Sequence, residues 1–220
     1  MEPLCFYDVD KEYIHYIQEA EIAAHGVSHV PYINYVEAGR RQKFFCGIVL
    51  QINDMNYYVP VSSTIKDNPG TFYLCAEDGR RTSSLRFTFM FPVPTACCAI
   101  RWLERETVPE YQALMKAEIL WCRQHEAEIR EIARQTYVEI FSGLNPELAE
   151  KSCDFPLLEA SCRQYCLEHD LSLGQSQAAN LLPPSPLLAL CRRAQDLSKA
   201  QNDLHRSANP LMKNAKERDE

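Results

Sequence analysis

The chain lacks the segments that would place it in a membrane or direct it out of the cell. No apolar stretch approaches the roughly 20 residues that a helix needs to cross a bilayer. The first ten residues, MEPLCFYDVD, contain no basic region followed by an apolar one. No internal repeat of fixed period is present either, which argues against solenoid and propeller folds. We therefore expect a cytoplasmic globular protein.

Cysteine, in contrast, is abundant, with ten residues in the chain. The cysteines are scattered through apolar runs, such as Cys46 in a predicted strand and Cys122 in a predicted helix. Most are therefore expected to be buried thiols rather than disulfides. Cys162, Cys166 and His169 have a helical spacing that suits three metal ligands, but no fourth ligand is apparent. A buried helix face is the favoured interpretation, and no metal site is predicted.

The composition fits one domain with a single core, or one domain with an appendage. The 220 residues are 46% hydrophobic and 24% charged, as in soluble globular proteins. A chain of this size buries about 70% of its extended surface. Segment 171–185 is rich in Ser, Gly and Gln and leads into LLPPSP at 181–186, which predicts a linker or a sharp turn. Segment 186–205 has helical periodicity, and the tail to residue 220 is polar. Whether that last helix docks on the domain or on another subunit is left open.

Charge is distributed unevenly along the chain. The net charge is −7, yet residues 38–105 contain nine basic and five acidic residues, which makes this segment +4 and the remainder −11. A local basic patch can bind nucleic acid on an acidic protein, because phosphate contacts depend on the local field. A solvated surface is the alternative interpretation, and charge alone does not overturn it.

The pattern of apolar residues predicts strands in the first half of the chain and helices in the second. Asp10 is a helix N-cap and Gly26 a helix stop, so a helix is expected over 11–25. After Pro109 the period becomes helical. The other predicted elements are strands over 4–9, 71–75, 84–89 and 96–102, two tandem helices or one kinked helix over 111–142, and helical structure over 145–168 that begins near residue 155.

A β-hairpin is predicted over residues 43–63, KFFCGIVLQINDMNYYVPVSS. Residues 44–52 and 57–61 are rich in aromatic and β-branched residues, and Asn53 and Asp54 supply the turn. Pro60 lacks a backbone donor, so the second strand is expected to lie at an edge or to end there.

Polar groups gather at the end of this hairpin. Lys43 precedes its first strand, and Ser62, Ser63, Thr64 and Lys66 follow its second. Hydroxyls and a cation on a loop held by a rigid hairpin can form an anion site. On the local sequence alone, a plain turn in which the serines bond the backbone is the favoured alternative.

Four phrases occur together and in order: FYDVDKEYIHYI, KFFCGIVLQINDMNYYVPVSS, FPVP and CDFPLLEASC. Together they resemble the ToxN/AbiQ family, the protein toxins of type III toxin-antitoxin systems, over residues 4–168. The resemblance implies an α+β fold, with a small twisted antiparallel barrel of the MazF/Kid type surrounded by helices. Residues 1–168 would form the nuclease domain, and residues 169–220 a C-terminal extension.

The resemblance also implies the activity. Such toxins are cytoplasmic endoribonucleases that need no metal or other cofactor and act in plasmid maintenance or abortive phage infection. A structured repeat RNA, expected to be a pseudoknot, holds them inactive in a closed protein–RNA assembly; the target is mRNA, and neither DNA nor membrane is a partner. Cleavage uses the 2'-hydroxyl as nucleophile and leaves a 2',3'-cyclic phosphate and a 5'-hydroxyl. No carboxylate pair with metal-ligand spacing stands near the hairpin.

The family pattern assigns catalytic roles to the hairpin. Lys43 would stabilise the phosphorane, and Ser62 and Ser63 would bond the phosphate. Lys66 takes the second lysine position only if the loop shifts by one residue, because the ungapped position holds Ile65. Tyr35, or less favourably Tyr32, takes the upstream tyrosine position only with an insertion, because the ungapped position holds Gly39.

Further contacts to RNA are expected from nearby polar side chains, with surface solvation as the alternative. His25 and His29 are alternative acid–base groups, although a surface loop is favoured for them. Two other functions stay open: an RNA-binding module without cleavage, and a protein-interaction domain that uses the C-terminal helix. The predicted RNA-binding residues are Arg40, Arg41, Thr64, Arg80, Arg81 and Arg86.

Overall fold

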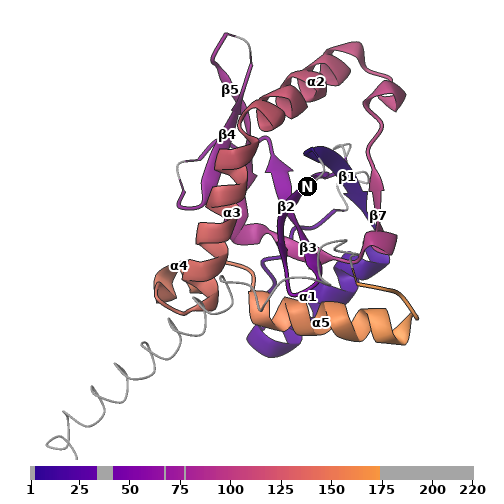
Figure 1. Cartoon of the computed structure of the whole chain (residues 1–220), viewed down its shortest axis with the longest axis vertical. Helices are drawn as coiled ribbons and strands as arrows, with labels where there is room; N and C mark the ends of the chain where they lie inside the picture. Colours follow the sequence, from indigo (N-terminus) through magenta and orange to yellow (C-terminus); the bar gives the residue numbers. More distant parts are fainter. Residues whose placement is uncertain (1–2, 34–41, 67, 77, 174–220) are drawn as a thin grey trace, which may run out of the picture.

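The computed structural model describes residues 3–33, 42–66, 68–76 and 78–173. Tyr35, Arg40 and Arg41 lie outside these ranges, as does almost all of the predicted extension over 169–220. The described chain is an α+β structure in which one antiparallel sheet is flanked by helices (Figure 1).

The sheet has seven strands in the order β4-β5-β3-β2-β1-β7, and β6 also pairs with β3. All of the strand pairs are antiparallel. The expected antiparallel α+β fold is confirmed, but in the described ranges β4 and β7 are the ends of the path and do not pair, so the sheet is not closed into a barrel. A relation to MazF/Kid stays a prediction. The strands are β1 (Cys5–Val9), β2 (Phe45–Ile52), β3 (Met55–Ser62), β4 (Thr71–Cys75), β5 (Arg81–Arg86), β6 (Phe91–Val93) and β7 (Cys98–Ile100).

Helices lie along one side of the sheet and at both of its ends (Figure 1). In Figure 1, α3 runs along one side, α2 crosses near the β4 and β5 end, and α1 and α5 lie together at the opposite end. The predicted helical segment over 111–142 forms two helices that meet at His125. The helices are α1 (Lys11–His25), α2 (Pro109–Gln124), α3 (Glu126–Phe141), α4 (Pro146–Glu150) and α5 (Phe155–Glu168).

Local signals set the ends of α1 as predicted. The Asp10 side chain accepts a hydrogen bond from the Glu12 backbone N–H at 2.8 Å, which satisfies one of the free donors of the first turn. Gly26 ends the helix with φ of 76°, in the left-handed region that glycine adopts without steric cost.

The β2–β3 hairpin is confirmed, with its turn at Asn53 and Asp54. Both residues have positive φ, 53° and 61°, as a two-residue hairpin turn with the twist of the strands requires. The expectation that Pro60 marks an edge or an end is wrong, because β3 is internal and continues to Ser62. On that side β3 pairs with β6 up to Tyr58 and with β5 from Val61, so Pro60 lies in the gap between two partners.

Two predicted strands differ from the structure. The strand expected over 84–89 is β5, which ends at Arg86 and gives way to a 3-10 turn, Phe87–Phe89. The turn places both Phe87 and Met90 in the core, which a straight strand would not do. Of the strand expected over 96–102 only β7 forms, after a second 3-10 turn, Thr95–Cys97. A third such turn, Leu103–Arg105, leads towards α2.

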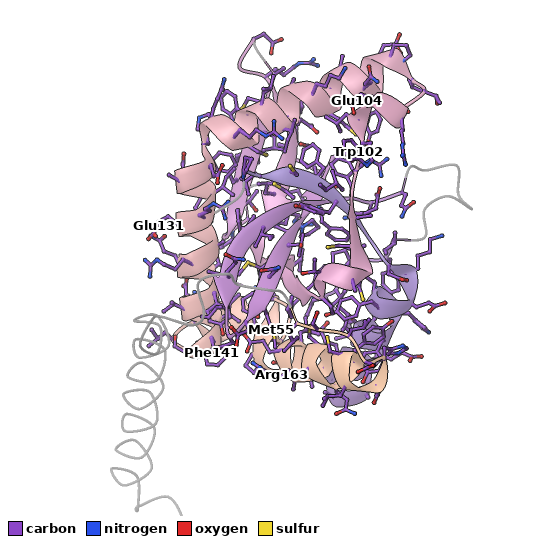
Figure 2. The ribbon with its side chains drawn as sticks, turned by 45° about the vertical axis from the view of Figure 1, so that its right-hand side comes forward. Met55, Trp102, Glu104, Glu131, Phe141 and Arg163 are labelled. Carbon is purple, nitrogen blue, oxygen red and sulfur yellow. The ribbon has the colours of Figure 1, made fainter. Side chains whose placement is uncertain are left out.

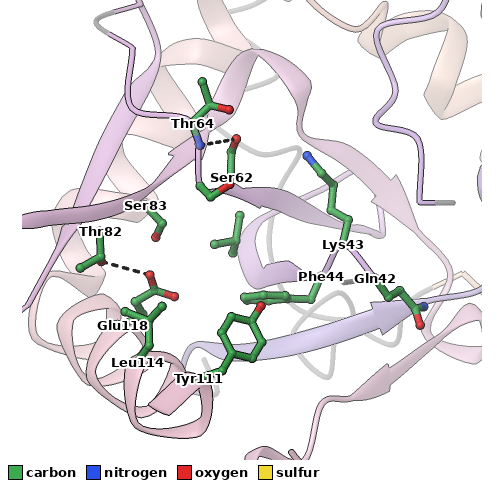
Figure 3. Close-up of a pocket in the computed structure, with 12 residues that line it drawn as sticks. Gln42, Lys43, Phe44, Ser62, Thr64, Thr82, Ser83, Tyr111, Leu114 and Glu118 are labelled. Carbon is green, nitrogen blue, oxygen red and sulfur yellow. Dashed lines mark hydrogen bonds between the residues drawn. The ribbon is translucent and has the colours of Figure 1, made fainter. Parts of the chain in front are cut away.

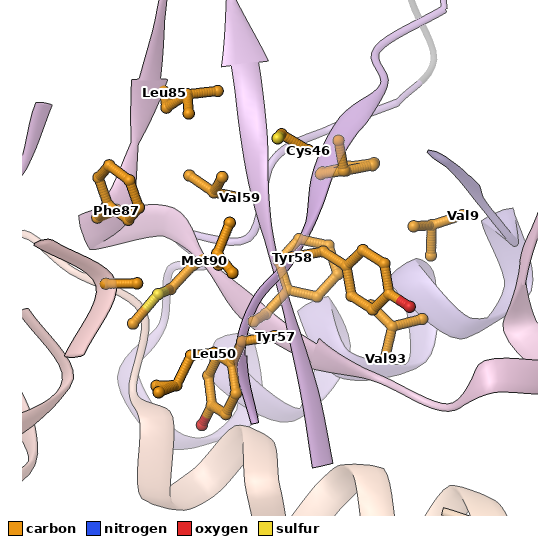
Figure 4. Close-up of a cluster of buried hydrophobic side chains, with 14 of the residues drawn as sticks. Val9, Cys46, Leu50, Tyr57, Tyr58, Val59, Leu85, Phe87, Met90 and Val93 are labelled. Atoms are coloured by element: carbon orange, nitrogen blue, oxygen red, sulfur yellow. The ribbon is translucent and has the colours of Figure 1, made fainter. Parts of the chain in front are cut away.

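Buried aromatic and aliphatic side chains of β2, β3 and β6 fill the centre of the molecule (Figure 4). The close approach of two strands requires Gly47, since a Cβ added there would lie 2.2 Å from Cδ1 of Tyr58. Tyr58 is almost fully buried, and its ring packs edge-on against Tyr7 at 5.0 Å between centroids. The ring therefore has little room to move away.

A buried carboxylate joins the hairpin to α5. Glu159 accepts hydrogen bonds from the hydroxyls of Tyr57 at 3.0 Å and Tyr137 at 2.7 Å. The side-chain amide of Asn53, in the hairpin turn, donates to its other oxygen at 3.0 Å. Three elements, the hairpin turn, β3 and α3, thus donate to one side chain of α5, and both carboxylate oxygens have donors.

Other residues match or correct the sequence predictions. The nine cysteines within the described residues are free thiols, and Cys162 and Cys166 are buried as expected. Trp102, the last residue of the strand expected over 96–102, is 56% exposed on the connection between β7 and α2 (Figure 2). None of the helices in the described part of the chain is long and apolar enough to cross a membrane.

The Gly47→Ala substitution tests the close strand contact. We expect it to lower the free energy of unfolding by about 1–3 kcal/mol, because the added methyl overpacks the core against Tyr58. Urea denaturation measures this difference. In a Tyr58→Leu background the cost of Gly47→Ala should shrink; an unchanged cost would show that the ring is not responsible.

Candidate functional site

A cavity of about 420 Å³ opens where the hairpin, β5 and α2 meet (Figure 3). It brings the two ends of the hairpin together with residues that lie far away in the sequence. Its lining residues are Gln42, Lys43, Phe44, Val61, Ser62, Ser63, Thr64, Thr82, Ser83, Tyr111, Leu114 and Glu118.

Lys43 is held beside this cavity by the pairing of the strands. The backbone N–H of Val61 donates to the carbonyl of Phe44 at 3.1 Å, which brings the start of β2 beside the end of β3. The amine is half-buried, and burial lowers the pKa of Lys43 from its ordinary value; the charge of Arg86 lowers it further. No carboxylate in the described ranges forms an ion pair with it, so the site favours an incoming anion.

The two serines differ in their surroundings. Ser62 is buried, and its hydroxyl accepts a hydrogen bond from the backbone N–H of Thr64 at 3.2 Å. That contact is the plain turn considered above. Ser63 is exposed and lines the cavity. The Ser84 hydroxyl donates to the carbonyl of Thr64 at 3.0 Å and holds the loop against β5. The predicted turn is thus present at Ser62, and it leaves Ser63 exposed at the cavity.

The opposite side of the cavity consists of residues that the sequence analysis missed. Thr82 and Ser83 come from β5, and Glu118 comes from α2. The Thr82 hydroxyl donates to Oε1 of Glu118 at 3.1 Å. Burial raises the pKa of Glu118, although the neighbouring Ser83 and Thr82 hydroxyls act to lower it. One signal was present in the sequence: Glu118 stands in the apolar stripe of α2, between Met115 and Cys122.

Lys66 lies outside this cavity. Its side chain is exposed, and its backbone carbonyl accepts a hydrogen bond from the Tyr73 hydroxyl at 3.0 Å. Ile65, which holds the ungapped position of the second lysine, is 44% exposed. The geometry thus joins Lys43 to the serines and does not join Lys66 to them.

The predicted RNA-binding arginines are not equivalent. Arg86 is half-buried, its guanidinium carbon lies 4.6 Å from the Phe89 ring centroid, and burial lowers its pKa. Arg81 stacks on Tyr73 at 3.8 Å, and Arg80 pairs with Asp78 at 3.8 Å on the exposed turn. Among these three, only the charge of Arg86 affects Lys43.

His25 and His29 lie elsewhere, at a second cavity of about 660 Å³ beside α4 and the start of α5. His25 pairs with Asp154 at 2.9 Å, and a ring nitrogen of His29 contacts the carbonyl of Glu150 at 3.0 Å. His169 stacks on Tyr165 with centroids 4.1 Å apart. Groups of three or more His, Cys, Asp or Glu able to hold a metal ion do not occur within the described ranges.

The chain matches a family model and a curated protein. The family model described as "Toxin ToxN, type III toxin-antitoxin system" matches residues 5–163. Among curated proteins, Endoribonuclease AbiQ of Lactococcus lactis subsp. lactis is 26% identical over 175 residues, which cover 74% of this chain and 89% of AbiQ.

Solved structures have the same fold. The structure of AbiQ, a lactococcal anti-phage endoribonuclease, matches with a TM-score of 0.66 at 22% identity and covers 76% of this chain and 99% of its own. A bacterial type III toxin selectively inhibited by a non-coding RNA pseudoknot matches with a TM-score of 0.65 at 24% identity, covering 74% and 98%.

The Lys43→Met substitution tests whether the cavity holds an unneutralised cation. Because the variant removes a charge that burial and Arg86 destabilise, we expect it to unfold about 2–4 °C higher in phosphate-free buffer, which corresponds to about 1 kcal/mol. Thermal unfolding measures the shift. Since the pKa of Lys43 is lowered in the folded state, the difference should be full below that pKa and shrink as pH rises towards 10.5, the ordinary lysine value.

Inorganic phosphate provides the matched measurement. Adding it should stabilise the wild type more than the Lys43→Met variant, because an anion neutralises the amine. Equal stabilisation of both proteins would contradict an anion site at Lys43.

Proposed function

The chain belongs to the ToxN toxin family of type III toxin-antitoxin systems, whose family model matches residues 5–163. On this basis we propose that it is an endoribonuclease toxin held inactive by RNA. The similarity to the endoribonuclease AbiQ supports the activity, and the similarity to a toxin inhibited by an RNA pseudoknot supports the inhibitor. Anti-phage defence or plasmid maintenance is the corresponding role. The end of the family match supports a nuclease domain over 1–168 and an extension over 169–220.

One observation carries the proposal: a half-buried lysine without a carboxylate partner in the described chain shares a cavity with an exposed serine. Lys43 supplies positive charge where little solvent screens it, and Ser63 supplies a hydroxyl from a loop held by Ser84. A phosphodiester carries the charge and the acceptors that these groups match.

The reaction that fits this site is attack of the 2'-hydroxyl on the adjacent phosphorus. The O–P bond to the 2'-oxygen forms, the bond to the 5'-oxygen breaks, and the products are a 2',3'-cyclic phosphate and a 5'-hydroxyl. Lys43 stabilises the phosphorane, whose charge exceeds that of the ground state, and Ser63 bonds a phosphate oxygen. The 2'-hydroxyl proton passes to water as the O–P bond forms, and a proton is delivered to the departing 5'-oxygen. Tyr35, which lies outside the described residues, is the proposed donor of that second proton.

Recognition of longer RNA follows the basic segment. Arg86 lies near Lys43 and extends the positive field, and Thr64 lines the cavity beside Ser63. Arg40, Arg41, Arg80 and Arg81 are proposed to contact phosphates of the target mRNA or of the inhibitory RNA. We infer that the inhibitor is a structured repeat RNA that covers this cavity in a closed assembly with the toxin in the cytoplasm.

A second candidate is an RNA-binding module without cleavage. It is favoured by the hydrophobic residue Ile65 at the second lysine position and by the placement of Lys66 outside the cavity. Such a protein would still bind RNA phosphates at the anion site but would not cleave the RNA.

Alanine variants of the site distinguish the two candidates. We expect Lys43→Ala and Ser63→Ala to lower the cleavage rate by about 10²- to 10³-fold, as loss of one transition-state contact does. Single-turnover cleavage of cellular RNA by toxin freed of its RNA measures the rates, and growth after induction reports toxicity. Lys116→Ala, which removes an exposed lysine of α2, is the matched control and should cleave normally.

Two outcomes would contradict the assignment. Equal toxicity of the wild type and both site variants would remove Lys43 and Ser63 from the active site. RNA binding without cleavage by folded wild-type protein would favour the binding module.

Chelation of metal ions tests the reaction type. Because the nucleophile belongs to the substrate and needs no metal-bound water, EDTA should leave the cleavage rate unchanged within about twofold. The products should resist 5'-phosphate-dependent exonuclease and should gain label from polynucleotide kinase. Loss of activity in EDTA with recovery on added Mg²⁺ would contradict this mechanism.

A further inference from the structure

The side of the cavity opposite Lys43 is a polar floor that the proposed cleavage does not use. It consists of Thr82, Ser83 and Glu118 (Figure 3). Glu118 is only 2% exposed and Ser83 only 4% exposed, so both are deep in the protein while still lining the cavity. Buried polar groups are normally satisfied by partners inside the fold.

Ser83 does not follow that rule. Its hydroxyl is buried and acts on the pKa of the nearby Glu118, yet it forms no hydrogen bond of normal geometry with any residue in the described part of the chain. Glu118 accepts a hydrogen bond from the Thr82 hydroxyl at Oε1, and no cation in the same part of the chain pairs with it. A carboxylate has about four acceptor positions, so capacity is left on both groups. An unsatisfied hydroxyl beside an under-used carboxylate indicates a ligand with donors and acceptors of its own.

The cavity has apolar walls besides this polar floor. Tyr111, Leu114, Phe44 and Val61 also line it. The volume of about 420 Å³ lies in the range of small-ligand sites, and apolar walls with a few convergent polar groups are typical of them. In an RNA bound with its phosphate at Lys43, the part of the nucleotide available to fill this space is a base.

We propose that Glu118 and Ser83 form a nucleobase subsite that accepts a base with an exocyclic amino group, adenine, cytosine or guanine, and rejects uracil. This inference rests on the proposed nuclease function. The amino N–H donates to the Glu118 carboxylate, and the Ser83 hydroxyl pairs with the neighbouring ring atom, as donor or acceptor. Uracil presents carbonyl oxygens on both sides of a single N–H. These oxygens are acceptors and would be repelled by the oxygens of a carboxylate.

We expect the site to reject uracil strongly, because a wrong base would leave buried polar groups without hydrogen-bond partners. A site built to hydrogen-bond its substrate discriminates strongly against an analogue that lacks the group. Thr82 acts as a positioning residue, since its hydroxyl bonds Glu118 and orients the carboxylate.

Sequencing of cleavage ends in a long RNA of mixed sequence tests the proposal, whatever motif the toxin cuts. With wild-type toxin, one position beside the cut should contain uracil at least about tenfold less often than the RNA offers it. Glu118→Gln should relax this depletion, because the amide N–H can donate to a uracil carbonyl. Ser83→Ala should relax it too, because it removes the hydroxyl that pairs with the base, a hydroxyl that has no partner of normal geometry in the described fold.

Ser161→Ala, which removes a hydroxyl of α5 that bonds the Leu157 carbonyl, is the control and should leave the depletion unchanged. Thermal unfolding verifies that each variant is folded. Cleavage by the wild type without any uracil depletion overturns the subsite and leaves the nuclease standing. Uracil depletion that persists in both variants also overturns the subsite. So does a cleavage rate that falls equally at all sites, because that result indicates a proton-transfer or structural role. Absence of cleavage by the wild type overturns both proposals.

Discussion

Burial of β3 along both of its edges is the constraint on which the rest of the structure depends. All eight of its residues are buried; β2 pairs with one edge, and β6 and then β5 pair with the other. A strand held on both sides cannot slip by one residue, because a slip would exchange its two faces. Its last residue, Ser62, therefore starts the loop at a fixed place, and the hydroxyls of that loop are presented to Lys43.

Elements whose signals are local were predictable from the sequence. The cap at Asp10, the stop at Gly26 and the hairpin turn depend on neighbours within a few residues. The errors came from contacts between distant segments. Pro60 is tolerated inside the sheet because two other strands meet opposite it. The strand expected over 84–89 ends at Arg86, where a 3-10 turn places Phe87 and Met90 in the core. A period of apolar residues contains no information about such partners.

The site divides in the same way. Lys43 and the serines come from one hairpin, so their proximity follows from the strand pairing that the sequence already indicated. The floor of the cavity comes from β5 and α2, which are brought there only by the complete fold. Glu118 stands in an apolar helix stripe, where its charge was the single sign of a role. Lys66, one residue away from its expected position, lies outside the cavity.

The carboxylate of Glu159 has a consequence for how the protein is made. It bonds Asn53 and Tyr57 in the hairpin, yet it belongs to α5, which the ribosome synthesises about a hundred residues later. Until that helix emerges, the hairpin lacks its buried acceptor, and the hydroxyls of Tyr57 and Tyr137 have no charged partner. The strands that bear Lys43 and Ser63 thus gain this contact only after α5 has been synthesised. A chain truncated before α5 would lack the buried acceptor of Asn53 and Tyr57.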